Sequence, residues 1–147
     1  MLSSNGTTET ITYFLNWVKK ESPTVWPAVI MTDRDQAQMN VIKRVYPDSQ
    51  TLLCLWHVLR AFRLHFITEE FQALWKRVKS WVRTEDSDEF DRIWAEMKTD
   101  PTVPRSFVQY LDTDWMPKEN MWSLSKWTER SLLEEGNTNM LIEVYVI

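Results

Sequence analysis

The stretch that decides the fold runs from Ala28 to Phe62 and reads AVIMTDRDQAQMNVIKRVYPDSQTLLCLWHVLRAF. Its pattern predicts a buried strand, an acidic turn, a helix, a second buried strand, and then a Cys-x-x-His that leads into another helix. Open α/β sheets place their functional groups at the carboxyl ends of parallel strands. Asp33, which directly follows the first apolar run, is therefore the first candidate for a functional residue.

The two predicted strands are joined by a helix. The almost unbroken apolar run Trp26–Met31 is typical of a strand that is buried on both faces. Asp35 is a predicted N-cap, with Gln38 as its capping-box partner, and the helix is expected to end near Tyr46, before a proline. The second strand is predicted over Thr51–Trp56. Two such strands with a connecting helix form a parallel βαβ unit.

Helical patterns surround this unit on both sides. The apolar spacing predicts further helices over Thr8–Lys20, His57–Phe66, Thr68–Val82, Ser87–Lys98, Arg105–Leu111 and Glu119–Trp127, and the start of a last one near Thr138. The predicted fold class is therefore α/β, with a βαβ part over residues 8–56, a helical insertion over 57–135 and the start of a C-terminal helix over 136–147. Because a two-stranded sheet is marginally stable, we expect residues 1–147 to form a single partial domain.

Composition narrows the class of protein. The chain has 147 residues, of which 44% are hydrophobic and 26% charged, as expected for a globular domain. Two glycines are too few for a Gly-rich phosphate loop. A single cysteine excludes an internal disulfide and favours an intracellular location, and no apolar run predicts a membrane span. The net charge of −4 argues against a surface that is devoted wholly to nucleic acid.

Two carboxylates carry any catalytic interpretation. Asp33 at a strand end could hold a divalent metal ion, or it could belong to an ordinary capping turn between strand and helix. Glu143 follows the segment Asn137-Thr138-Asn139. Taken alone, Glu143 is also explained as an acidic residue near a helix N-terminus, where the helix dipole favours negative charge.

Two other groups have a chemical and a structural interpretation. Cys54 and His57 could be half of a zinc site, but the chain has no second cysteine and only His65 as a further histidine. They could equally be a buried cysteine that ends a strand and a histidine that opens a helix. One helix also carries a basic face that could meet a phosphate backbone or simply face solvent: Lys76, Arg77, Lys79 and Arg83.

Together these motifs resemble the transposase domain of Mutator-like elements, the MULE family. The resemblance rests on the order of the block from Met31 to His57, a long helical segment and the final NTNMLIE. It implies an RNase H-like fold and an Asp-Asp-Glu triad that binds two Mg²⁺ or Mn²⁺ ions and cuts and joins DNA at transposon ends. By resemblance, Asp33 is the second catalytic aspartate and metal ligand, Glu143 is the catalytic glutamate and metal ligand, and Cys54 and His57 match the family's Cys-x-x-His.

The sequence also departs from the family pattern. The first aspartate of the triad is expected on a strand upstream, and no aspartate precedes Asp33 in this sequence. Because two metal ions need several carboxylates, we expect this chain alone to lack strand-transfer activity. The uncovered sheet edge and apolar surface are expected to favour aggregation. We expect DNA to be the partner and expect no association with a membrane. The expected location is intracellular and nuclear, and a homo-oligomer remains possible.

Two other functions remain open at this point. The chain could be a domesticated, non-catalytic DNA-binding or regulatory protein that derives from a transposase. It could also be a generic interaction domain, although that leaves the joint order of Asp33, the Cys-x-x-His and Glu143 unexplained.

Overall fold

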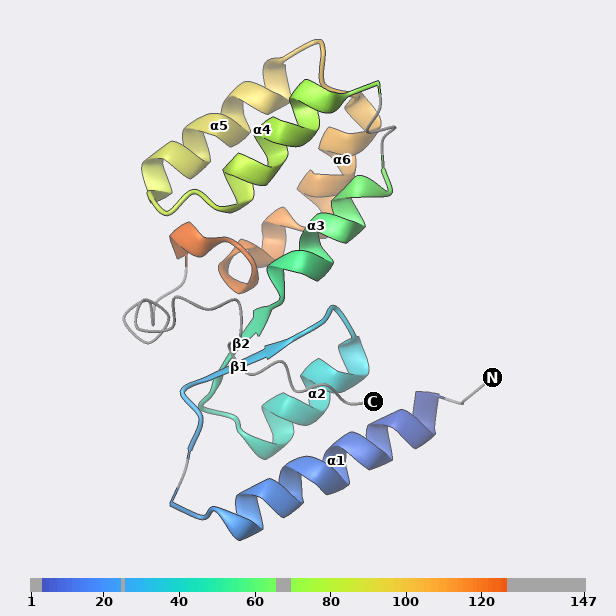
Figure 1. Ribbon diagram of the computed structural model, residues 1–147, viewed down its shortest axis with the longest axis vertical. Helices are drawn as coiled ribbons and strands as arrows, with labels where there is room; N and C mark the ends of the chain where they lie inside the picture. The colour runs from blue at the N-terminus through green and yellow to red at the C-terminus, as the bar shows by residue number, and fades with distance from the viewer. Residues whose placement is uncertain (1–3, 25, 66–69, 127–147) are drawn as a thin grey trace. The chain divides into compact units, whose positions relative to one another are not determined.

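The computed structural model describes residues 4–24, 26–65 and 70–126 (Figure 1). These residues divide between Leu53 and Cys54 into two compact units. The first unit contains α1 (Ser4–Glu21), β1 (Val29–Thr32), α2 (Gln36–Val45) and β2 (Gln50–Leu53). The second unit contains α3 (Leu55–Arg63), α4 (Gln72–Val82), α5 (Ser87–Thr99), α6 (Arg105–Asp114) and the 3-10 helices η1 (Met116–Met121) and η2 (Leu124–Lys126).

The first unit is a βαβ unit with one additional helix. β1 and β2 pair in parallel, from Val29 opposite Gln50 to Thr32 opposite Leu53. α1 packs against α2, and the apolar side chains between them form a continuous core. The core consists of Ile11, Leu15, Val41, Ile42, Val45 and Tyr46. The predicted parallel βαβ unit is confirmed.

A lysine fixes the end of α1 to the end of α2. Lys19 Nζ donates a hydrogen bond to the backbone oxygen of Val45 at 3.0 Å. The same ammonium lies 4.6 Å from the ring centroid of Trp26, whose indole meets the Tyr46 ring edge-on at 5.4 Å. The lysine therefore satisfies a C-terminal carbonyl of α2 while its charge faces an aromatic ring.

The predicted strand boundaries are wrong by a few residues. β1 begins at Val29 rather than Trp26 and includes Thr32. β2 ends at Leu53, so the last three residues of the predicted strand Thr51–Trp56 leave the sheet, and Cys54 caps α3 instead. The reason is that a short apolar run does not distinguish a strand from the first turn of a buried helix.

The predicted N-cap of α2 is confirmed, but its capping box is not formed as expected. Asp35 Oδ1 accepts a hydrogen bond from the backbone nitrogen of Gln38 at 2.9 Å. The Gln38 side chain does not complete the reciprocal bond. Its Oε1 instead accepts from Thr32 Oγ1 at 2.8 Å.

The second unit is helical and is held together by aromatic side chains. α4 packs against α3 and α5, and α6 packs against η1. Phe62 of α3 meets Trp115 and Trp122 edge-on, with ring centroids 4.9 and 5.6 Å apart. Trp81 of α4 stacks on Phe90 of α5 at 4.8 Å. All five side chains are fully buried, and aromatic rings of this kind dominate the buried area of a small core.

The helix predicted over Glu119–Trp127 is wrong for the residues that the structure describes. Two short 3-10 helices, η1 and η2, stand in its place. η1 begins next to Pro117 and is kinked at Lys118, whose φ of −125° lies outside the helical range. The mixture of a parallel strand pair with helices agrees with the α/β prediction, whereas the RNase H-like assignment stays a prediction.

Candidate functional site

Asp33 lies one residue beyond the end of β1, where the sequence predicts a functional carboxylate. Its side chain is half-buried, and Oδ1 is shielded from solvent without a hydrogen-bond partner among the described residues. A carboxylate oxygen that is shielded from solvent without a donor is costly, and coordination of a cation is one way to offset that cost. Asp33 therefore fits the role of one ligand to a divalent metal ion.

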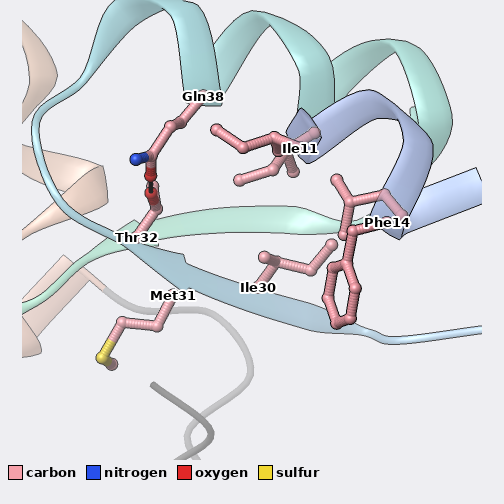
Figure 2. Close-up of a pocket in the computed structure, with 8 residues that line it drawn as sticks. Ile11, Phe14, Ile30, Met31, Thr32 and Gln38 are labelled. Atoms are coloured by element: carbon pink, nitrogen blue, oxygen red, sulfur yellow. Dashed lines mark hydrogen bonds between the residues drawn. The ribbon is translucent and has the colours of Figure 1, made fainter. Parts of the chain in front are cut away.

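The turn that carries Asp33 is closed at both ends by Gln38 (Figure 2). Figure 2 shows the Thr32 hydroxyl at the end of β1 meeting the Gln38 side chain of α2. The backbone nitrogen of the same glutamine is held by Asp35. The contact with Thr32 was not predicted, although a threonine at the strand end and a glutamine in the first helical turn are signals that could have suggested it.

The pocket beside this turn is too small to hold an organic substrate. Its cavity volume is about 30 Å³, which is roughly the space for one water molecule. In Figure 2, Ile11 and Phe14 of α1 line it together with Ile30 of β1. The pocket is lined mostly by apolar side chains, so it offers few groups for acid–base or metal chemistry.

Cys54 and His57 lie at the beginning of α3, as the Cys-x-x-His spacing predicts. Cys54 is buried at the N-cap position, where its side chain makes no capping hydrogen bond. His57 is half-buried, and its Nδ1 is shielded from solvent without a hydrogen-bond partner among the described residues. The imidazole meets the Trp56 ring edge-on at 4.8 Å.

The described part of the chain offers no further ligands for a zinc site at Cys54 and His57. No group of three or more His, Cys, Asp or Glu side chains that could hold a metal ion occurs within residues 4–24, 26–65 and 70–126. His65, the other histidine, stacks on the Tyr110 ring with centroids 3.4 Å apart. Glu143, the second predicted catalytic carboxylate, lies outside the described residues.

The basic face of α4 is largely engaged within the protein. Arg77 donates to Asp100 at 2.9 Å and pairs with Glu96 at 3.5 Å. Arg83 donates to the backbone oxygen of Lys79, and the Lys79 ammonium lies 5.7 Å from the ring centroid of Trp75. These contacts favour a structural role for this face over the alternative of binding a phosphate backbone.

The carboxylates with a shifted pKa belong to the surface of the helical unit. Hydrogen bonds from the hydroxyl and backbone nitrogen of Thr102, together with Arg77, hold the pKa of Asp100 below its ordinary value of 3.8. A hydrogen bond from Arg92 lowers the pKa of Glu89. These shifts accompany ion pairs on or between helices and so indicate no acid–base site.

Comparison with known proteins gives two matches. Residues 1–61 match the MULE transposase domain, so the predicted resemblance is confirmed for this part of the chain. A stretch of 74 residues is 32% identical to the protein FAR-RED IMPAIRED RESPONSE 1 of Arabidopsis thaliana, and it covers 48% of this chain and 9% of that protein. No solved structure matches the chain. Within the described residues, no helix has the length and apolar character needed to cross a membrane.

Proposed function

Residues 1–61 match a MULE transposase domain, and from this premise we propose that the chain derives from a DNA transposase and retains Asp33 as a metal-ligand position of the catalytic site. The observation that carries the proposal is that Oδ1 of Asp33, just after β1, is shielded from solvent and has no hydrogen-bond partner within residues 4–24, 26–65 and 70–126. The stretch that matches the family contains this residue, and a carboxylate oxygen is a ligand that Mg²⁺ and Mn²⁺ prefer.

The metal ion in this proposal is Mg²⁺ or Mn²⁺, held by Asp33 and by Glu143. Such an ion supplies Lewis-acid stabilisation of the charge that develops on oxygen in phosphoryl transfer. The chain's own residues hold the turn that carries the metal-binding carboxylate. The hydrogen bonds of Gln38 fix this turn, and Asp33 extends from it.

We propose that this chain alone binds the metal ion but neither cleaves nor transfers a DNA strand. No aspartate precedes Asp33 in the sequence, so the two carboxylates Asp33 and Glu143 stand where the family uses three. Two metal ions held for an in-line displacement need the full set of ligands.

A second candidate is a domesticated regulatory protein that binds DNA, has a nuclear location and performs no catalysis. The similarity to FAR-RED IMPAIRED RESPONSE 1 favours it, because the name of that protein refers to a light response rather than to transposition. In this case DNA binding by the chain depends on salt but not on Mg²⁺ or Mn²⁺.

Paramagnetic broadening by Mn²⁺ tests the metal site directly and detects weak binding. In an NMR titration of the 147-residue chain with substoichiometric Mn²⁺, the amide signals of Thr32 and Arg34 broaden first. The Asp33→Asn variant loses this broadening. The matched control Asp48→Asn, which neutralises an exposed carboxylate in the same unit, keeps it. Equal broadening in wild type and Asp33→Asn would refute the proposed metal-ligand position.

A plasmid assay tests the absence of strand cleavage. Supercoiled DNA incubated with the purified chain and Mg²⁺ or Mn²⁺ is expected to stay supercoiled. Nicked product that needs the metal ion and disappears in Asp33→Asn shows instead that the chain is catalytically competent.

A further inference from the structure

One face of α3 combines an exposed tryptophan with two exposed arginines. Trp56, Arg60 and Arg63 occupy positions i, i+4 and i+7 of the helix, so they lie along a single face. Trp56 is 59% exposed, whereas three other tryptophans of the same unit are fully buried. We call Trp56, Arg60 and Arg63 the α3 face. The exposed indole beside two arginines makes the α3 face a candidate surface for a partner.

The two arginines of the α3 face have no acidic partner among the described residues. Arg77 and Arg92 on the neighbouring helices α4 and α5 both form ion pairs with carboxylates. α3 itself contains no acidic residue. The positive charge of Arg60 and Arg63 therefore remains available to an anion from outside the described part of the chain.

The indole is held in place by its neighbours. The Arg60 guanidinium carbon lies 5.2 Å from the centroid of the Trp56 ring, within the range of a cation–π contact. The His57 ring meets the same indole edge-on, at an interplanar angle of 88°. Two neighbours thus restrict the ring before any ligand arrives, which lowers the entropy lost on binding.

We propose that the α3 face binds single-stranded DNA, with the Trp56 indole stacking on an unpaired base and Arg60 and Arg63 contacting phosphates. Aromatic rings that stack on bases, flanked by unpaired cations that follow the backbone, are the general means by which proteins bind single strands. The choice of DNA rests on the proposed function, whereas the location on α3 rests on exposure and charge. An acidic peptide would also use the arginines, but it would stack on the indole only if it carried an aromatic side chain, whereas every nucleotide of a single strand offers a base.

Fluorescence anisotropy with a labelled single-stranded DNA of about 20 nucleotides tests this inference, since a strand of that length exceeds the sites of about 4–16 nucleotides that OB-fold proteins use to bind single strands. Trp56→Ala weakens binding roughly 5- to 150-fold, the range expected for loss of one stacked base. Trp56→Phe, which keeps an aromatic face, binds within a few-fold of the wild type. The double variant Arg60→Gln, Arg63→Gln makes the plot of log association constant against log salt concentration less steep, by about 1.4 in the magnitude of its slope.

Matched controls separate this surface from general effects of charge and aromatic content. Arg44→Gln with Arg83→Gln removes the same two charges elsewhere on the surface and leaves the affinity close to wild type. Trp17→Ala removes a tryptophan that is 50% exposed on α1 and does the same. Circular dichroism of each variant confirms that the helices remain folded.

Every other outcome overturns the inference. If the control pair weakens binding as much as the α3 pair, DNA is held by overall charge and not by this face. Binding to RNA or to an acidic peptide without binding to DNA refutes the choice of ligand. If no DNA binds at all while Mn²⁺ still broadens the signals beside Asp33, the inference fails and the proposed metal-ligand position stands.

Discussion

The tryptophans of this chain range from fully buried to mostly exposed. Their surroundings determine how much a substitution lowers the free energy of unfolding. Trp122 is fully buried, and its Nε1 donates to the backbone oxygen of Trp115 at 3.0 Å. Its ring also meets Phe62, Trp81 and Phe90 within 6 Å between centroids. Which rings meet could not be predicted from the sequence, because contacts between distant helices are not encoded locally.

We predict that Trp122→Ala lowers the free energy of unfolding by about 3–5 kcal/mol, because it leaves a large cavity among four rings. Trp56→Ala should change it by less than about 1 kcal/mol, since Trp56 is mostly in water. Urea denaturation followed by far-UV circular dichroism measures both values. Equal losses in the two variants would show that the aromatic cluster does not stabilise the helical unit.

At the residue scale, the sequence placed Asp33 correctly after the end of β1, whereas its role as a metal ligand stays a prediction. The acidic turn after an apolar run was readable because strand ends in α/β proteins follow simple sequence patterns. The contact between Thr32 and Gln38 was not predicted, because the sequence suggests two partners for the Gln38 side chain, Thr32 and the capping box, without deciding between them. Glu143 lies outside the described residues, so its role stays a prediction.

Among the elements, the helices with clear boundary signals were predicted best. α5 begins at Ser87 as predicted, after the N-cap Asp86, whose Oδ1 accepts from the Glu89 backbone nitrogen at 2.8 Å. β2 was predicted too long, because the residues after Leu53 are as apolar as those before it. Caps carry local information, whereas the end of a buried apolar run depends on what packs around it.

We predict that Asp86→Ala lowers the free energy of unfolding by about 1 kcal/mol, because it leaves the Glu89 nitrogen without its acceptor. Asp86→Asn should change it little, since asparagine caps helices equally well. Thermal and urea denaturation of the two variants provide the comparison. A similar loss in both would indicate that the negative charge, and not the hydrogen bond, is what α5 requires.

At the scale of the whole molecule, apolar side chains are distributed unevenly between the two units. α1 exposes Tyr13 at 76% and Trp17 at 50%, on the side of the helix away from Ile11 and Leu15. The helical unit buries most of its large rings. The predicted aggregation tendency therefore has a specific surface to which it can be assigned.

We predict that Tyr13→Lys with Trp17→Lys reduces self-association of the chain without lowering its melting temperature by more than about 2 °C, because exposed positions contribute little to stability. Light scattering at increasing concentration measures association. Leu15→Lys, which places a charge in the core, should unfold the first unit instead. Unchanged scattering in the double variant would show that another surface causes aggregation.

The closure of the acidic turn by Gln38 has a consequence for any attempt to rebuild a metal centre on this chain. The segment from Thr32 to Asp35 is tied at each end to one glutamine, once through its side chain and once through its backbone. The backbone on both sides of Asp33 is therefore held by the fold, so an incoming cation has to order only the carboxylate itself. New ligands can be introduced around Asp33, whereas Thr32 and Gln38 are the positions that such a redesign should leave untouched.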